Sequence, residues 1–367
     1  MNIQRILFVI PTMQQGGAER VVSVMANFWA NKNFQVSIIS FDDQPSCYPL
    51  DKKICYYNLN SSKKSAFFLI KIRNNFIRAQ NYFFYVNKIN PTVIISFTRN
   101  ANMYCILYNF FLKRQLIVGE TTNPSFPILP KGMNYLPRLI YKFATAMVVQ
   151  TVESLKIFKD LKISLPGKKE IIYNPISEAT FSKVYKLKRQ NIVLAVGRLE
   201  NNTKQFDKLI NIFNASDNDG WELHIAGTGT DYQNLQKQIE GLNLQRKVFL
   251  LGSVRQLNEV YQRAKIFALT SIREGFPNAL CEAMANGCAC ISYNCPIGPS
   301  AIINNNVNGI LIEPGNEETF RETLSFLMKD EPTIKRISNE AYKIIDMLDE
   351  TKIFKKWEHF INEVVEN

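Results

Sequence analysis

Residues 266–287, with the sequence IFALTSIREGFPNALCEAMANG, predict a strand, a loop and a helix in that order. The strand is the short apolar run 266–269, and the helix extends over residues 279–286. Pro277 suits the first turn of that helix, and Gly287 suits the residue after its end. A buried stripe at the i, i+3, i+4 spacing is supplied by Leu280, Ala283 and Met284. A strand followed by such a helix is the repeating unit of an α/β fold.

The same alternation of short strands and longer helical patterns continues in both directions, which indicates βαβ connections and parallel sheets. In the first half of the chain, strands are expected at residues 6–10, 36–41, 93–97, 116–120, 147–150 and 170–173. A second series is expected at residues 192–196, 223–226, 248–251, 266–269, 289–292 and 309–312. The two series predict two Rossmann-like domains, joined by the polar stretch 177–190.

The C-terminal part of the chain is predicted to be helical. After Gly315 the strand signals stop, and two helical segments are expected, one ending near Leu348 and one near Val364. The last segment has an apolar face at helical spacing, formed by Phe354, Trp357, Phe360 and Ile361. That face must pack on one of the two domains.

Composition limits the possible classes of protein. With 367 residues the chain has room for about two domains of roughly 150 residues each. A hydrophobic content of 46% excludes a disordered, collagen-like or coiled-coil chain. Seven cysteines without a CxxC pair, and only two histidines, argue against a disulfide framework and a zinc site. We expect Cys288 and Cys290 to be packing residues.

The net charge of +12 is unevenly distributed. Residues 1–180 hold 22 basic and 9 acidic side chains, whereas residues 181–367 hold 22 and 23. No helix-turn-helix, RNA-recognition signature or zinc module accompanies the excess of positive charge, so nucleic-acid binding is not expected. The first domain alone is predicted to be cationic.

No targeting or membrane-spanning segment is evident. No uncharged apolar run approaches the roughly 18–20 residues that a bilayer span requires. The run 6–10 is followed by Pro11 and then a glycine pair instead of a small-residue cleavage site, which favours a buried strand over a secretory signal. We therefore expect the chain to stay in the cytoplasm.

The loop after the first predicted strand contains Gly16 and Gly17 and leads into a helix. Two glycines let backbone or phosphate approach closely, and a helix start attracts anions. A simple tight turn explains them equally well. The loop lacks GxGxxG spacing, so a nicotinamide cofactor is not indicated.

Two carboxylates near the helix 279–286 are candidate ligand contacts. Glu274 lies in the preceding loop, and Glu282 lies off the buried stripe, towards the crevice beyond the strands. Carboxylates accept hydrogen bonds from hydroxyl groups, so the pair could hold a hydroxyl-rich ligand. From spacing alone, both could instead simply favour the helix dipole.

Several motifs occur in one order over nearly the whole chain. They are GGAER at residues 16–20, VGETTNP at 118–124, YNP at 173–175, VGRL at 196–199 with Lys204, AGTG at 226–229, EGFPN at 274–278, EAMANG at 282–287, GPS at 298–300 and NG at 308–309. This set resembles the retaining family 4 glycosyltransferases, also described as glycosyl transferases group 1. The resemblance implies the α/β fold called GT-B, with two Rossmann-like domains facing a cleft and a C-terminal helix that crosses back to the first domain. The implied domains are residues 1–180 with the helix at about 350–367, and residues 181–349.

The resemblance also implies roles for individual residues. The implied catalytic residues are Glu274, Arg198 and Lys204. The implied donor-binding residues are Gly16, Gly17, Gly275, Phe276, Pro277, Asn278, Ala279, Glu282, Gly227 and Arg255. The acceptor-side candidates are Glu19, Arg20, Glu120, Thr121 and Thr122. Arg198 and Lys204 would stabilise the departing diphosphate, because fixed cations stabilise developing negative charge.

The expected reaction moves a hexose or N-acetylhexosamine from a nucleotide sugar, expected to be UDP-linked, to a growing surface glycan such as a capsule, O-antigen or lipopolysaccharide. In the family mechanism the leaving phosphate takes the acceptor's proton, so neither a protein base nor a metal or other cofactor is expected. A nucleotide-sugar 2-epimerase, a phosphorylase of the same fold and a noncatalytic partner of another transferase are the alternatives.

The sequence departs from the family pattern at two positions. Many relatives have a histidine where this chain has Thr121, and an acidic residue where it has Ala301. Its only histidines are His224 and His359, so a histidine in the first domain is not expected, and His224 is predicted to be structural within a strand. The DND sequence at residues 217–219 imitates a metal-binding motif of another fold, but a metal role is not expected there.

The cationic first domain suggests a partner. Basic clusters occur at residues 63–64, 71–73 and 113–114, and aromatic side chains lie near them, especially over residues 63–85. This combination suits an anionic membrane surface. A glycan on a polyprenyl-diphosphate carrier would be found at such a surface. We therefore expect peripheral docking on the inner face of the cytoplasmic membrane. The alternative is a core-facing aromatic stripe with a solvated basic face.

Overall fold

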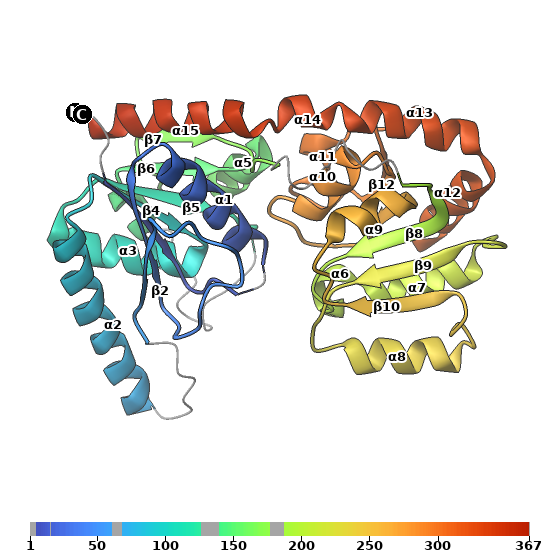
Figure 1. The fold of residues 1–367 in the computed structure, drawn as a ribbon, viewed down its shortest axis with the longest axis horizontal. Helices are drawn as coiled ribbons and strands as arrows, with labels where there is room; N and C mark the ends of the chain where they lie inside the picture. Colours follow the sequence, from blue (N-terminus) through green and yellow to red (C-terminus); the bar gives the residue numbers. More distant parts are fainter. Residues whose placement is uncertain (1–4, 15, 61–67, 126–138, 177–186, 367) are drawn as a thin grey trace. The chain divides into compact units, whose positions relative to one another are not determined.

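The computed structural model describes residues 5–14, 16–60, 68–125, 139–176 and 187–366. The chain forms two units, which are considered separately below (Figure 1). Unit 1 consists of Met1–Pro175 and Thr351–Asn367, and unit 2 of Ile176–Glu350. Most of the predicted linker, residues 177–186, lies outside the described residues.

Unit 1 contains a parallel sheet in the order β3-β2-β1-β4-β5-β6-β7. Its strands are β1 (Arg5–Ile10), β2 (Gln35–Ser40), β3 (Cys55–Asn58), β4 (Val93–Phe97), β5 (Leu116–Glu120), β6 (Ala146–Val149) and β7 (Lys168–Ile171). All but β3 match strands that the sequence predicts. Strand β3 lies at the sheet edge and is only half buried, so it lacks the apolar run by which the other strands are recognised.

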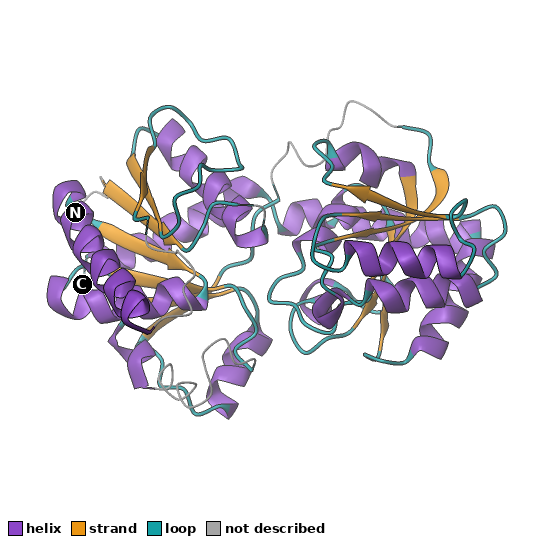
Figure 2. Cartoon of the chain, turned by 90° about the horizontal axis from the view of Figure 1, so that it is seen from below, coloured by secondary structure: helices purple, strands orange, loops and turns teal. Residues whose placement is uncertain are grey.

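Helices cover both faces of this sheet (Figure 2). They are α1 (Gly17–Asn31), α2 (Phe68–Ile89), α3 (Arg99–Leu112), the 3₁₀ turn η1 (Tyr141–Phe143), α5 (Val152–Asp160) and α15 (Glu350–Val365). Alternate residues of β1 enter two different cores: Ile6 and Phe8 belong to one, Leu7 and Val9 to the other. This alternation follows from the two-residue period of a strand whose faces are both covered. Among the described residues, none of the helices combines the length and apolar character that a bilayer-spanning segment requires.

The last helix, α15, packs on unit 1. Its predicted apolar face is buried in the same core as Phe8 and Trp29. The Phe354 ring lies 5.9 Å from that of Trp29, and the Trp357 ring lies 6.1 Å from that of Phe97. The expected return of the C-terminal helix to the first domain is confirmed.

Unit 2 contains a parallel sheet in the order β10-β9-β8-β11-β12-β13. Its strands are β8 (Gln190–Val196), β9 (Glu222–Ala226), β10 (Val248–Gly252), β11 (Ala264–Leu269), β12 (Ala289–Tyr293) and β13 (Ile310–Ile312). Its helices are α6 (Asn201–Lys204), α7 (Phe206–Ala215), α8 (Tyr232–Gly241), α9 (Leu257–Arg263), α10 (Asn278–Ala285), α11 (Pro299–Ile302), α12 (Glu317–Lys329), α13 (Glu331–Tyr342) and α14 (Ile344–Met347). All six predicted strands are present.

The predicted helical segment ends where expected, with α14 stopping at Met347, but it is divided into the three helices α12, α13 and α14. The Asp330 side chain caps α13 by accepting a hydrogen bond from the Thr333 amide, and Pro332 occupies the first turn. A cap followed by proline begins a new helix, so the earlier one stops.

In both sheets the strand order reverses at one point, between β1 and β4 in unit 1 and between β8 and β11 in unit 2. In open parallel sheets, ligands bind beyond the carboxyl ends of the strands at such a reversal. The loops that follow these four strands are therefore the places to look for chemistry.

Candidate active site

An ion pair lies at the strand-order reversal of unit 2. Lys204 follows β8, Glu274 follows β11, and the Lys204 Nζ lies 2.6 Å from the Glu274 Oε1. The two side chains are 18% and 10% exposed. Two of the three predicted catalytic residues are thus in direct contact although 70 positions separate them.

Local hydrogen bonds fix the position of Lys204. The short helix α6 ends at Lys204, and the next residue, Gln205, adopts the left-handed conformation with φ of 52°. The Thr270 hydroxyl donates to the Lys204 carbonyl at 2.9 Å, and the Ile272 amide donates to the Thr203 carbonyl at 3.0 Å. The segment that bears Lys204 is therefore attached to the loop that bears Glu274.

Glycines allow the neighbouring loops to touch. Gly227 has a φ of +144°, and a Cβ atom there would lie 1.8 Å from the Gly197 carbonyl oxygen. A Cβ at Gly229 would lie 2.4 Å from the Leu199 carbonyl oxygen. The VGRL and AGTG motifs are thus two backbones in contact, which explains their glycines without a ligand.

The helix α10 begins beside this pair. Pro277 precedes its first residue, and Gly287 follows its end with a φ of +72°, as the sequence predicts. Gly298 has a φ of +106°, and a Cβ there would lie 2.8 Å from the Pro277 Cδ, so the GPS loop lies against the start of the helix. Phe276 is buried, Gly275, Asn278 and Ala279 are half buried, and Glu282 within the helix is 7% exposed.

The pKa values of two buried thiols, Cys281 and Cys295, are affected by the charges of the ion pair. Burial, and then the negative charges of Glu282 and Glu274, raises the pKa of the Cys281 thiol well above its ordinary value. Burial, and then Glu274, raises the pKa of Cys295 to about 12, an effect that Lys204 partly offsets. Both carboxylates therefore lie near one small region around α10, where the thiols stay protonated.

The third predicted catalytic residue is placed differently. The Arg198 side chain is 68% exposed and pairs with Glu200 at 3.3 Å, instead of joining Lys204 and Glu274. Arg255, a predicted donor contact, is also exposed, in the loop after β10. Both guanidinium groups are accessible to a ligand.

In unit 1 the predicted glycine loop follows β1. Gly16 precedes α1 in extended backbone, and Gly17 is the first residue of the helix. The Tyr48 hydroxyl donates to the Gly16 carbonyl at 2.8 Å and accepts from the Gly16 amide at 3.0 Å. The Glu19 carboxylate folds back over Gly16, where a Cβ would lie 2.1 Å from Oε2. The sequence does not predict the contact between Tyr48 and Gly16, because only the fold brings these two residues together.

Glu120, an acceptor-side candidate at the end of β5, is 2% exposed. Its Oε2 accepts from the Tyr141 hydroxyl at 2.6 Å and lies 3.5 Å from the Arg99 Nε. Its Oε1 accepts from the hydroxyl and the amide of Thr122. Burial, and then Glu120, raises the pKa of Tyr141 well above its ordinary value. Both oxygens of this carboxylate therefore have structural partners, whereas Thr121 next to it is half exposed, as is Arg20 in α1.

The histidines and the DND sequence have local partners. His224 in β9 lies 2.7 Å from the Glu222 carboxylate, as a structural residue would. His359 lies on α15, so the expectation that the first domain lacks histidine is wrong: the returning helix brings one to unit 1, where it is exposed and faces Glu363 at 3.4 Å. Asp217 pairs with Lys329 at 2.5 Å. Within the described ranges, no cluster of three or more metal-ligating side chains is present.

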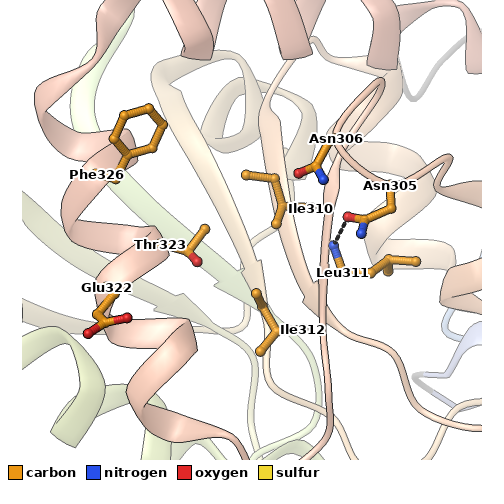
Figure 3. Close-up of a pocket in the computed structure, with 8 residues that line it drawn as sticks. All are labelled: Asn305, Asn306, Ile310, Leu311, Ile312, Glu322, Thr323 and Phe326. Carbon is orange, nitrogen blue, oxygen red and sulfur yellow. Dashed lines mark hydrogen bonds between the residues drawn. The ribbon is translucent and has the colours of Figure 1, made fainter.

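A shallow pocket of about 440 Å³ lies on the edge strand β13 of unit 2, away from the predicted residues (Figure 3). The Asn305 side chain accepts a hydrogen bond from the Leu311 amide at 2.9 Å and thereby covers part of the strand edge. The pocket is lined by Asn305, Asn306, Ile310, Leu311, Ile312, Glu322, Thr323 and Phe326. Its mixed apolar and amide lining contains none of the predicted site residues.

Comparisons with known proteins match part of the chain to a family and most of it to individual relatives. Residues 177–344 match the family described as Glycosyl transferases group 1. A Campylobacter jejuni α-1,4-N-acetyl-D-galactosaminyltransferase, named for a GalNAc-containing diNAcBac-PP-undecaprenol, is 28% identical over 99% of this chain and 99% of its own length. The amylovoran biosynthesis glycosyltransferase AmsD of Erwinia amylovora is 27% identical over 95% of this chain and 96% of its own.

The fold agrees with this similarity. The crystal structure of Anabaena Alr3699/HepE in complex with UDP and glucose has a TM-score of 0.82 with this chain, at 17% identity, and the match covers 98% of this chain and 100% of that one. Both units contain the parallel Rossmann-like sheet of GT-B enzymes. Residues 177–344 are thus similar to the group 1 glycosyltransferases, and the whole chain has the GT-B fold.

Proposed function

We propose that the protein transfers a hexose or N-acetylhexosamine from a UDP-linked sugar to a hydroxyl group of a growing bacterial surface glycan, with retention of configuration. The acceptor is carried by a polyprenyl diphosphate at the inner face of the cytoplasmic membrane. The observation that carries this proposal is the Lys204–Glu274 pair at the strand-order reversal of unit 2. A cation suited to a diphosphate and a carboxylate suited to sugar hydroxyls meet there.

In the proposed reaction the bond between the sugar C1 and its diphosphate oxygen breaks, and the acceptor oxygen bonds to the same face of that carbon. The acceptor's proton passes to the departing phosphate oxygen. Negative charge grows on the diphosphate as its bond breaks, so fixed cations lower the barrier. Lys204 supplies a point charge, and the accessible guanidinium of Arg198 supplies a planar fork for phosphate oxygens.

The carboxylates divide the recognition of the donor. Glu274 accepts hydrogen bonds from hydroxyls of the transferred sugar, assisted by the backbone of residues 275–279 at the start of α10. Glu282 holds the ribose hydroxyls. In unit 1, the loop of Gly16 and Gly17 follows β1 at the other strand-order reversal. Its proposed role is to bind the donor and the acceptor.

Relatives support the choice of substrates. Two full-length relatives are named as N-acetylgalactosaminyltransferases that act on diphospho-undecaprenol-linked sugars, and the Anabaena structure contains UDP. We therefore propose a UDP donor and a lipid-linked acceptor, with the enzyme bound peripherally to the membrane.

Catalysis is proposed to need no metal, because Lys204 and Arg198 occupy the role that a divalent cation would have at the diphosphate. Activity should persist in excess EDTA. Complete loss in EDTA, restored by Mg²⁺ or Mn²⁺, would refute this part of the proposal.

The test is transfer by the purified full chain from a panel of UDP-sugars to polyprenyl-diphosphate-linked acceptors, with the anomeric configuration of the product read by NMR. Glu274→Gln should lower kcat by about a hundredfold or more, the scale of a lost electrostatic contact. Glu317→Gln is the matched control, because it removes the carboxylate of another lysine pair in unit 2, with Lys208 at 2.9 Å.

Other outcomes would name other functions. Conversion of a UDP-sugar without acceptor would indicate an epimerase, and a requirement for free phosphate would indicate a phosphorylase. Inversion at C1 would overturn retention. Equal turnover by wild type and Glu274→Gln would place the chemistry elsewhere.

A further inference from the structure

Exposed aromatic side chains are concentrated on one part of unit 1. Of the six phenylalanines that are largely exposed among the described residues, five lie on α2, α3 and η1. At the end of α3, Phe110 is 67% and Phe111 is 75% exposed, and Phe143 of η1 is 55% exposed. Leu107 and Leu139 next to them in sequence are also exposed. We call Leu107, Phe110, Phe111, Leu139 and Phe143 the α3 aromatic patch.

Ring contacts show that the patch is continuous. The Phe110 ring lies 5.7 Å from Phe111 and 6.4 Å from Phe143, which joins α3 to η1. The Phe111 ring lies 6.3 Å from Phe83, which joins α3 to α2. Rings that contact one another yet remain exposed form an apolar surface, and such a surface marks an interaction site.

The segment of chain that contains the patch is strongly basic. Residues 52–152, which include all of α2, α3 and η1, hold 14 basic side chains and a single acidic one. That one is Glu120, which is buried and paired with Arg99. The cations next to the patch include Lys113, directly after α3, and Lys142, whose Nζ lies 5.1 Å from the centre of the Phe143 ring. The partner must therefore accept aromatic rings and carry negative charge.

We propose that the α3 aromatic patch is the surface that inserts into an acidic phospholipid bilayer, with Lys113 and Lys142 contacting the headgroups. Aromatic side chains favour the boundary between headgroups and acyl chains, and lysines nearby add attraction to anionic lipid. This inference rests on the proposed lipid-linked acceptor and names the surface that would bring the enzyme to it.

The patch differs from the segment 63–85 that the sequence singles out. Residues 63–67 lie outside the described residues, and Tyr82 within the segment is completely buried in the core. Phe110 and Phe111 belong to a helix whose other faces are apolar too, so the sequence alone does not distinguish its exposed face.

The experiment is co-sedimentation of the full chain with vesicles of phosphatidylglycerol and phosphatidylethanolamine, compared with phosphatidylcholine alone, at low ionic strength. The double variant F110S/F111S should bind the anionic vesicles at least about tenfold more weakly than the wild type does. Its matched control is F326S, which removes an exposed phenylalanine, 52% exposed, from unit 2. The variant K113Q/K142Q should also bind more weakly, by about fivefold for each lysine, whereas the exposed unit 2 pair K237Q/K335Q should not.

UDP binding by calorimetry, measured on the same variants, separates this inference from the proposed function. Equal vesicle binding by wild type and F110S/F111S would overturn the patch as the docking surface. Absence of vesicle binding by a wild type that still binds UDP would overturn membrane docking, here and in the proposed function, and leave the proposed transfer reaction standing. A wild-type dimer that F110S/F111S converts to a monomer would show that the patch is an interface between copies, which also overturns the inference.

Discussion

At the scale of single residues, Glu120 shows how the fold changes the meaning of a motif. Its position in VGETTNP resembles an acceptor-side residue, but both carboxylate oxygens are engaged within unit 1. This carboxylate is buried, accepts hydrogen bonds from hydroxyl and amide groups and lies beside a guanidinium. Such an environment indicates a structural role and not a ligand contact. We infer that it holds the loop after β5 in place, so that any acceptor contact comes from the half-exposed Thr121 beside it.

Glu120→Gln should therefore destabilise unit 1 by about 2–4 kcal/mol, because it leaves the buried Arg99 without its counter-charge and reduces the acceptors for Thr122 and Tyr141. Urea denaturation followed by tryptophan fluorescence measures this change in a Trp221→Phe background, since the two remaining tryptophans, Trp29 and Trp357, are buried in unit 1 and Trp221 belongs to unit 2. Glu322→Gln, at an exposed position, is the control. An unchanged midpoint would contradict a structural role for Glu120.

At the scale of elements, the contact between the loops after β8 and β9 is the feature on which the candidate site depends. Gly227→Ala should push these loops apart, because its Cβ would lie 1.8 Å from the Gly197 carbonyl oxygen. Since Lys204 lies over Gly197, with a Cβ there 3.1 Å from Lys204 Cε, we expect UDP binding to weaken by at least about tenfold. Calorimetric titration of UDP measures the effect.

Gly220→Ala is the matched control for this substitution. Gly220 also has a positive φ, +72°, but a Cβ there would meet nothing within 4 Å. The control variant therefore has the strain of an alanine at a positive φ, but its Cβ collides with no neighbouring atom. Equal loss of UDP affinity in both variants would mean that strain alone, and not the contact between the loops, is responsible.

The helix α15 is the second element with a testable role. Phe354 is completely buried and its ring lies 4.1 Å from that of Phe28, so Phe354→Ala should cost unit 1 about 3–5 kcal/mol. Amide hydrogen exchange should show faster exchange in α1 and α15, while β8–β13 of unit 2 keep their protection. Phe326→Ala, at an exposed position, is the control. Equal loss of protection in both units would contradict the assignment of α15 to unit 1.

At the scale of the whole molecule, the sequence predicts most of the fold because buried parallel strands form apolar runs that alternate with amphipathic helices. It misses β3, whose half-buried CYYN segment has no such run. It identifies Glu274 as a candidate ligand contact from its loop and Lys204 from the family motifs, but it does not predict their contact, since the strand order that joins them is a tertiary property. The environments of Glu120, Arg198 and Tyr48 depend on contacts between distant segments, which no local pattern encodes.

Three buried thiols and the half-buried phenol of Tyr108 predict how the stability of the chain depends on pH. Burial raises the pKa of Cys288 to about 11 and the pKa of Cys105, Cys295 and Tyr108 to about 12. In the unfolded chain a thiol titrates near 9, so above that pH the unfolded state loses protons that the folded state keeps. The stabilisation is complete below about pH 9 and is lost as the pH rises towards 12.

Each of these buried thiols should therefore lower the free energy of unfolding by about 1 kcal/mol between pH 7 and pH 10. Urea denaturation at pH 7, 8.5 and 10 measures the slope. Cys288→Ala should flatten it, because that variant has one fewer group whose pKa differs between the two states, whereas Cys47→Ala removes an exposed thiol and should leave it unchanged. Stability that stays constant or rises from pH 8.5 to 10 would mean that the interior admits these groups in their charged forms. The cores around α3 and α10 would then be more open to water than the complete burial of Cys105 and Cys288 indicates.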